Sequence, residues 1–161
     1  MTDTDALALR SLERLLSELL DGPPPEEAFV LNAGDRGLLA SLDRLSSDAA
    51  SAHAPGRSSV AAHVDHLHYG FGLLNRWAQG EDPWGDADWA ASWQRQEVGA
   101  EQWRELRAAF AKEAKAWRGV LKTPRAWDAQ AMTIALANTV HLAYHLGAIR
   151  QIDQGTAGPP A

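Results

Sequence analysis

The sequence of 161 residues contains no cysteine. This absence excludes disulfide bonds, thiolate ligands for a metal ion and a cysteine nucleophile. A chain without cysteine is compatible with the reducing cytoplasm, and we expect the protein to be cytoplasmic. The first residues, MTDTDALALRSLERLL, are acidic and then amphipathic, which does not fit a secretory signal peptide. Any metal ion that the protein binds must therefore be held by nitrogen or oxygen atoms.

Long apolar runs and clusters of basic residues are also missing. No window of about 18 residues is uninterruptedly apolar, so we expect no transmembrane span. Acidic residues outnumber basic ones by 21 to 15, which gives a net charge of −6. The sequence has no basic patch that would neutralise phosphates or lie on an anionic membrane surface. We therefore expect neither nucleic acid nor a membrane as a partner.

Helical periodicity runs through most of the chain, and little of the alternation typical of strands is present. Gly22 and the prolines that follow it end the first helical segment. The pattern predicts long helices at residues 4–20, 59–79, 97–122 and 129–154, with a shorter amphipathic piece over 35–51. We expect the tail to be loose from about residue 155. The sequence thus predicts an all-α fold, a single domain over residues 1–161 built as a four-helix bundle with short extra helices.

The last predicted helix carries His141 and His145, four residues apart, in an apolar run. They belong to a stripe with the spacing of a bundle seam: Ile134, Asn138, His141, His145, Ala148 and Ile152. We therefore expect both imidazoles to point inward. Residues four apart on a helix have Cβ atoms about 5–6 Å apart, which lets two imidazoles bind one cation. Two core histidines satisfied by a hydroxyl or a carbonyl group are the alternative, and this helix alone leaves both open.

The second long helix offers further histidines in the segment AAHVDHLHYG. His66 lies beside the apolar seam of this helix and can face the interior. We expect His63 to flank the other side of that seam and His68 to be more exposed, while His53 falls in a loop. A histidine-rich surface turn without special meaning is the alternative. His66 is therefore the candidate for a third ligand on a second helix, which a catalytic metal site usually needs.

The segment SVAAHVDHL, followed far downstream by HLAYHLGAIRQ, resembles the DinB/YfiT-like superfamily of helix bundles assigned as metal-dependent enzymes. The resemblance covers the chain from about Gly34 onward, and the stretches DWAASW and EQW resemble a tryptophan-rich subgroup. It implies a four-helix bundle of that type and a divalent cation held by His66, His141 and His145. One departure is Ser58, which stands where a tryptophan often precedes the motif serine. That departure concerns the start of the helix and touches no ligand.

Three neutral imidazoles suit zinc, nickel or iron, and the ligand type alone does not choose among them. Leu142 stands where an H-E-x-x-H protease keeps its glutamate base, so hydrolysis lacks an evident general base. Some relatives in the superfamily use low-molecular-weight thiols, and a coordinated thiol is deprotonated without a protein base. We therefore expect a metal-dependent enzyme that activates a low-molecular-weight thiol on a small-molecule substrate, and a homodimer. A metal-dependent hydrolase and a non-catalytic, stress-related homodimer are the alternatives.

Several other side chains are candidates to orient a ligand or to contact a substrate. They are Asp65, Asn138, Tyr144 and Trp77. All seven tryptophans lie between residues 77 and 127, and we expect most of them to fill the core or anchor loops. The alternative for three of them is to cover the mouth of the site or a subunit interface, where aromatic residues are enriched: Trp84, Trp89 and Trp93.

Overall fold

The computed structural model describes residues 3–159, and within them helices form all of the regular secondary structure. Four helices are long: α1 (Asp3–Asp21), α4 (Val60–Ala78), α5 (Ala100–Lys122) and α6 (Ala129–Ile152). Two are short, α2 (Gly37–Asp43) and α3 (Ser47–Ser51), and single 3-10 turns lie at η1 (Ala91–Trp93) and η2 (Gln154–Thr156). The all-α prediction is confirmed. None of the helices in the described part combines the length and the apolar character needed to cross a membrane.

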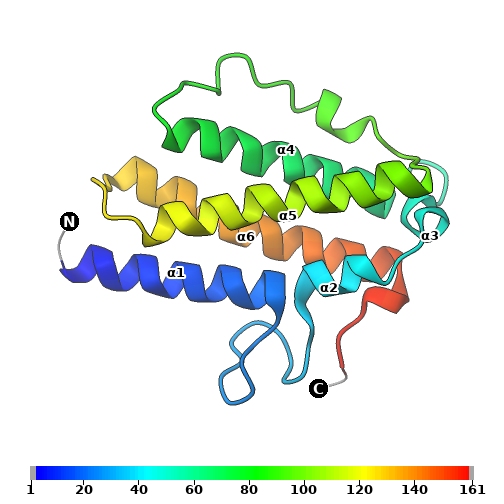
Figure 1. Cartoon of the computed structure of the whole chain (residues 1–161), viewed down its shortest axis with the longest axis horizontal. Coiled ribbons are helices and arrows are strands. Elements are labelled where there is room, and N and C mark those ends of the chain that lie inside the picture. The colour runs from blue at the N-terminus through cyan, green and yellow to red at the C-terminus, as the bar shows by residue number, and fades with distance from the viewer. Residues whose placement is uncertain (1–2, 160–161) are drawn as a thin grey trace.

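The four long helices run side by side around one core (Figure 1). Helix α5 packs against α1 and α4, and α6 packs against the same two helices. The short helix α2 contacts α1 and α5, while α3 contacts α4 and α5. The segment between α4 and α5 passes along the outer side of α4 before it enters α5 (Figure 1). The histidine-bearing helices α4 and α6 are therefore neighbours in the assembled domain.

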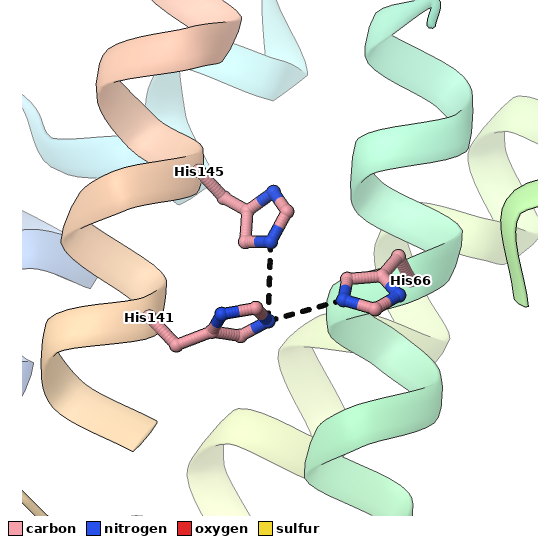
Figure 2. A group of neighbouring side chains, drawn as sticks. All are labelled: His66, His141 and His145. Carbon is pink, nitrogen blue, oxygen red and sulfur yellow. Dashed lines mark hydrogen bonds between the residues drawn. The ribbon is translucent and has the colours of Figure 1, made fainter. Parts of the chain in front are cut away.

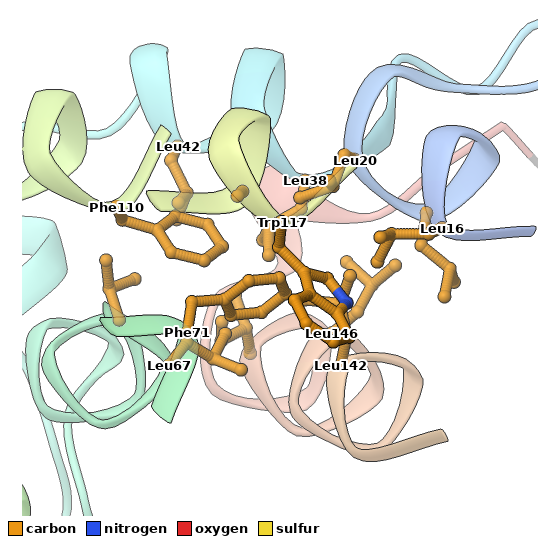
Figure 3. Close-up of a cluster of buried hydrophobic side chains, with 14 of the residues drawn as sticks. Leu16, Leu20, Leu38, Leu42, Leu67, Phe71, Phe110, Trp117, Leu142 and Leu146 are labelled. Atoms are coloured by element: carbon orange, nitrogen blue, oxygen red, sulfur yellow. The ribbon is translucent and has the colours of Figure 1, made fainter. Parts of the chain in front are cut away.

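The core joins side chains from all four long helices (Figure 3). Phe71 of α4 and Phe110 of α5 are fully buried and meet edge to face, with ring centroids 5.7 Å apart. Trp117 of α5, Leu142 of α6 and Leu16 of α1 are fully buried beside them. Full burial of a large apolar side chain is worth about 1.5–3 kcal/mol. This shared packing holds α4 and α6 at a set distance and orientation.

Side-chain caps place the two helix starts that matter for the site. Ser59 caps α4, because its Oγ accepts a hydrogen bond from Ala62 N–H at 3.1 Å. Asp128 caps α6 by accepting from Ala131 N–H at 2.7 Å. Each cap satisfies a backbone donor that the first turn of a helix leaves unpaired. The caps thereby set where α4 and α6 begin and which turn each histidine occupies.

The prediction of one amphipathic piece over residues 35–51 is wrong, because this segment forms two separate helices, α2 and α3. Ser46 accepts a hydrogen bond from Ala49 N–H at 3.1 Å and so starts a new helix. The carbonyl oxygen of Leu45, between the two helices, accepts from the indole N–H of Trp103 at 2.9 Å. Trp103 lies on α5, so the break is stabilised by a tertiary contact. Local sequence patterns do not contain that information.

The tail also differs from the expectation of a loose segment from about residue 155. Thr156 in η2 is buried, and its hydroxyl donates to the carbonyl oxygen of Asp153 at 2.6 Å. The carbonyl oxygen of Pro159 accepts from Asn32 Nδ2 at 2.9 Å. The tail therefore packs against the segment after α1 as far as residue 159. The rest of the predicted loose tail, residues 160–161, lies outside the described residues.

One buried carboxylate organises the segment between α1 and α2. Glu18 is only 2% exposed, and its Oε1 accepts hydrogen bonds from the backbone N–H groups of Phe29, Val30 and Leu31 at 3.0, 2.7 and 2.7 Å. A carboxylate that accepts several backbone donors makes strong, charge-assisted hydrogen bonds. Glu18 thereby holds this irregular segment against the end of α1.

Replacing Glu18 with alanine should lower the free energy of unfolding by about 3 kcal/mol. The three N–H groups lose their acceptor, and a buried donor left unpaired costs about 1–3 kcal/mol. Urea unfolding followed by circular dichroism measures the change. The matched control is Glu26→Ala in the same segment, where the side chain is exposed and a change within about 0.5 kcal/mol is expected. Equal effects of the two substitutions would contradict the role of Glu18.

Candidate metal centre

Three histidines from two helices converge in the space between α4 and α6 (Figure 2). His66 lies on α4, and His141 and His145 lie one turn apart on α6. The three rings point toward one another across the space between the two ribbons (Figure 2). The structure thus brings together the three residues that the sequence singled out as ligands.

The Nε2 atoms of these rings have the spacing of ligands around one cation. His141 Nε2 lies 3.1 Å from His66 Nε2 and 3.1 Å from His145 Nε2. One ligand atom from each of the three residues lies within 4.8 Å of the others. Two nitrogens bound at about 2.0–2.1 Å to the same cation are about 2.9–3.4 Å apart for angles between a right angle and the tetrahedral value. The two separations from His141 therefore match those of ligands that share one divalent metal ion.

Ser92 determines which nitrogen of His66 faces the site. His66 Nδ1 lies 2.8 Å from Ser92 Oγ, and the Ser92 hydroxyl donates its own proton to the carbonyl oxygen of Trp89 at 2.7 Å. Ser92 Oγ must therefore accept the Nδ1–H of His66. In a neutral imidazole this leaves Nε2 with a free lone pair, which is the form that binds a metal. Sequence reasoning missed Ser92, because nothing in the stretch DWAASW places this serine against His66, 26 residues upstream.

A fourth histidine, His63, belongs to the same cluster. It is buried, and its Nδ1 lies 2.8 Å from Nδ1 of His145. Trp93 packs over the group, with its ring stacked on His66 at 4.3 Å and edge-on to His63 at 5.1 Å. The sequence prediction placed His63 beside the seam and assigned it no role. Its position three residues before His66 on one helix face was the available signal.

The buried face of α6 is rotated from the predicted seam. His145 is fully buried as expected, whereas His141 is exposed. The most deeply buried apolar positions are Ala135, Leu142, Leu146 and Ile149. Helix α6 is apolar nearly all round, so its pattern does not single out one face. The two histidines lie at the edge of the core stripe, where one ring reaches the core and the other reaches solvent.

The segment between α4 and α5 is bound to α4 over the histidines. The backbone N–H of Asp88 donates to the hydroxyl of Tyr69 at 2.8 Å. Asp65, which was expected to assist a ligand, instead faces Arg95 of this segment, with Oδ1 3.5 Å from Nε. Asp65 therefore helps to fix the segment that carries Ser92.

The remaining candidates divide between the site and the far end of α4. Tyr144 is exposed and lies edge-on to His145 at 5.2 Å between ring centroids. Asn138 is buried one turn before His141, and its Oδ1 has no hydrogen-bond partner among residues 3–159. Trp77 packs against Trp117 and lies away from the histidines, eleven positions after His66 on α4. Its expected role at the site stays a prediction.

Two hollows flank the histidine cluster. One, of about 440 Å³, is lined mostly by apolar side chains and reaches His141; Trp84, Trp89 and Asn138 are among its walls. The other, of about 860 Å³, reaches His63, Trp93 and Tyr144. The described residues that line the two hollows include no aspartate or glutamate. Trp84 and Trp89 line the first hollow and Trp93 lines the second, as the alternative of a place at the mouth of the site would require.

All four imidazoles favour the neutral form. Burial, followed by the charges of His141 and His63, lowers the pKa of His66 to about 4. Burial, followed by the charges of the three neighbouring histidines, lowers the pKa of His145 to about 3. Burial also lowers the pKa of His63 and of His141. The ring nitrogens are therefore available as lone-pair donors near neutral pH.

The metal-free protein should lose stability as the pH falls below 6.5. Unfolded histidines bind protons near pH 6.5, while native His66 and His145 stay neutral until about pH 4 and pH 3. The unfolded state therefore binds more protons in this window, and the free energy of unfolding falls with the pH. Urea unfolding of wild type and His145→Gln between pH 7 and pH 4.5 measures the free energy of unfolding. This free energy should fall less steeply with the pH in the variant. His53→Gln, at an exposed histidine, is the control. The lowered pKa of His145 would be contradicted if His145→Gln left the pH dependence of the free energy of unfolding unchanged while His53→Gln flattened it.

Comparison of the chain with protein-family models, with curated proteins and with solved structures finds no match. The resemblance to the DinB/YfiT-like superfamily thus rests on the sequence motifs alone.

Proposed function

We propose that the protein binds a divalent cation through Nε2 of His66, His141 and His145, as a member of the DinB/YfiT-like superfamily. The observation that carries the proposal is the convergence of three Nε2 atoms, with His141 Nε2 3.1 Å from each of the other two. Imidazole nitrogens removed from water cost free energy unless something pairs with them. A shared cation satisfies all three lone pairs at once, and the four-helix core holds the two helices in the required register.

The donor set supports zinc, nickel or iron as the cation. All three ligands are neutral imidazoles, which suit these metals better than magnesium or calcium, since the latter prefer oxygen. The bond from His66 Nδ1 to Ser92 Oγ, at 2.8 Å, orients one of the ligands before any metal binds. Three protein ligands also leave coordination positions open for a further molecule.

We infer that the reaction is the transfer or rearrangement of a group on a low-molecular-weight thiol. A bound divalent cation lowers the pKa of a coordinated thiol, so that the thiolate is present near neutral pH. His141 is exposed and borders the apolar hollow, which offers a small-molecule substrate a route to the site. This chemistry requires no carboxylate base, in agreement with the described lining of both hollows.

A metal-dependent hydrolase is less well supported, because the side chains near the histidines supply no free carboxylate as a general base. Leu142 is buried in the core, and Asp65 faces Arg95. A homodimer and a cytoplasmic location remain predictions. The apolar side chains exposed on the outer face of α6 are the surface that a second copy would cover: Leu136, Val140 and Tyr144.

Zinc binding tests the proposal directly. Wild-type protein should bind about one zinc ion per chain, and its melting temperature should rise because a ligand that binds only the native state stabilises it. The His141→Ala/His145→Ala double variant should lose both effects. His53→Ala, which removes an exposed histidine outside the cluster, should retain them. Elemental analysis and thermal unfolding measure the two effects, and zinc retained by the double variant would refute the site.

The thiol proposal is tested by supplying metal-loaded protein with an electrophile and a panel of low-molecular-weight thiols. We expect thiol-dependent consumption of the electrophile, measured by absorbance, that disappears in the metal-free protein and in the double variant. Ester hydrolysis without any thiol would instead favour a hydrolase. Full metal loading with neither activity would favour the non-catalytic homodimer.

A further inference from the structure

His63 touches the cluster but is not one of its three converging rings. Its Nδ1 lies 2.8 Å from Nδ1 of His145, on the side of the His145 ring opposite the site. The Nε2 of His145 faces His141 at 3.1 Å. His145 therefore has one ring nitrogen directed to the site and the other directed to His63.

The short distance between the two Nδ1 atoms requires that one of them donates a proton and the other accepts it. If His63 donated, neutral His145 would carry its own proton on Nε2, and that nitrogen would have no lone pair for a metal. If His145 donates, its Nε2 is free and His63 is the acceptor. The direction of this one hydrogen bond thus decides whether His145 can act as a ligand.

The neighbouring ligand shows the same arrangement with a different acceptor. His66 donates its Nδ1–H to Ser92 Oγ at 2.8 Å, which frees its Nε2. The two buried ligand rings, His66 and His145, therefore each have a side-chain partner at Nδ1. The exposed ring of His141 has no Nδ1 partner among the side chains of residues 3–159. Packing also holds the acceptor in place, since His63 is buried and lies edge-on to Trp93 at 5.1 Å.

We propose that His63 is a positioning residue of the metal site. Its Nδ1 accepts the Nδ1–H of His145 and holds that ring in the tautomer and orientation that present Nε2 to the cation. This inference rests on the proposed function of His66, His141 and His145 as metal ligands. It adds a residue that binds no metal itself and whose loss weakens binding through His145.

The test compares zinc affinity in full-length wild type, His63→Leu and His63→Asn by competition with a chelator of known affinity. His63→Leu removes the acceptor and should weaken zinc binding by about 10–100-fold, the usual cost of losing such a partner. His63→Asn places an amide oxygen close to the position of Nδ1 and should restore most of the affinity. His68→Leu, on the same helix but outside the cluster, is the matched control and should bind zinc as wild type does.

Two spectroscopic measurements separate positioning from a general loss of structure. The absorption spectrum of the cobalt-substituted protein should change in His63→Leu and return in His63→Asn. In zinc-loaded wild type, long-range 1H–15N correlation spectra should show Nδ1 of His145 protonated and Nδ1 of His63 bare. The second measurement needs no variant, so it remains decisive if His63→Leu fails to fold.

The possible outcomes distinguish this inference from the proposal beneath it. Equal zinc affinity and equal cobalt spectra in wild type and His63→Leu would overturn the role of His63 and leave the metal site intact. A protonated Nδ1 on His63 in the zinc-loaded protein would also overturn it. No zinc binding by wild type would overturn both the metal site and the positioning role.

Discussion

The need to pair the ring nitrogens of four imidazoles governs the region between α4 and α6. Three of these rings, His63, His66 and His145, are buried while His141 is exposed, and desolvation favours the neutral form of all four. Nδ1 of His66 is paired with the hydroxyl of Ser92, and Nδ1 of His145 is paired with Nδ1 of His63. The three Nε2 atoms that remain face one another, and a single Nε2–H on neutral His141 can be shared between the other two rings only as a divided hydrogen bond. A divalent metal ion is the simplest group that pairs with all of them.

The rest of the molecule keeps this arrangement in place. On the inner side, the apolar core locks α4 and α6 together through Phe71, Trp117 and Leu142 (Figure 3). On the outer side, the segment before α5 contributes Ser92 and Trp93 and is tied to α4 through Tyr69. Ligands carried on rigid helices and oriented by a second layer of contacts are held more precisely than ligands on loops alone. The site therefore depends equally on the bundle and on one irregular segment.

Local patterns predict the helices and the converging histidines well, and tertiary contacts poorly. Ser59 and Asp128 act within their own first turns, so the helix starts are visible in the sequence. The break at Leu45 depends on Trp103, and the role of Ser92 depends on His66, and each pair is brought together only by folding. Helix α6 is apolar on most of its surface, so its buried face could not be identified from periodicity. His63 was within reach, since it shares a helix face with His66, but its partner lies on another helix.

The central claim is that His66, His141 and His145 bind one cation through Nε2. X-ray absorption spectroscopy at the zinc edge of the zinc-loaded protein tests it most directly, because outer-shell scattering identifies imidazole ligands. The account predicts three imidazole nitrogens at about 2.0–2.1 Å and a further light atom from solvent. Zinc surrounded by oxygen atoms, with no imidazole scattering, would contradict it.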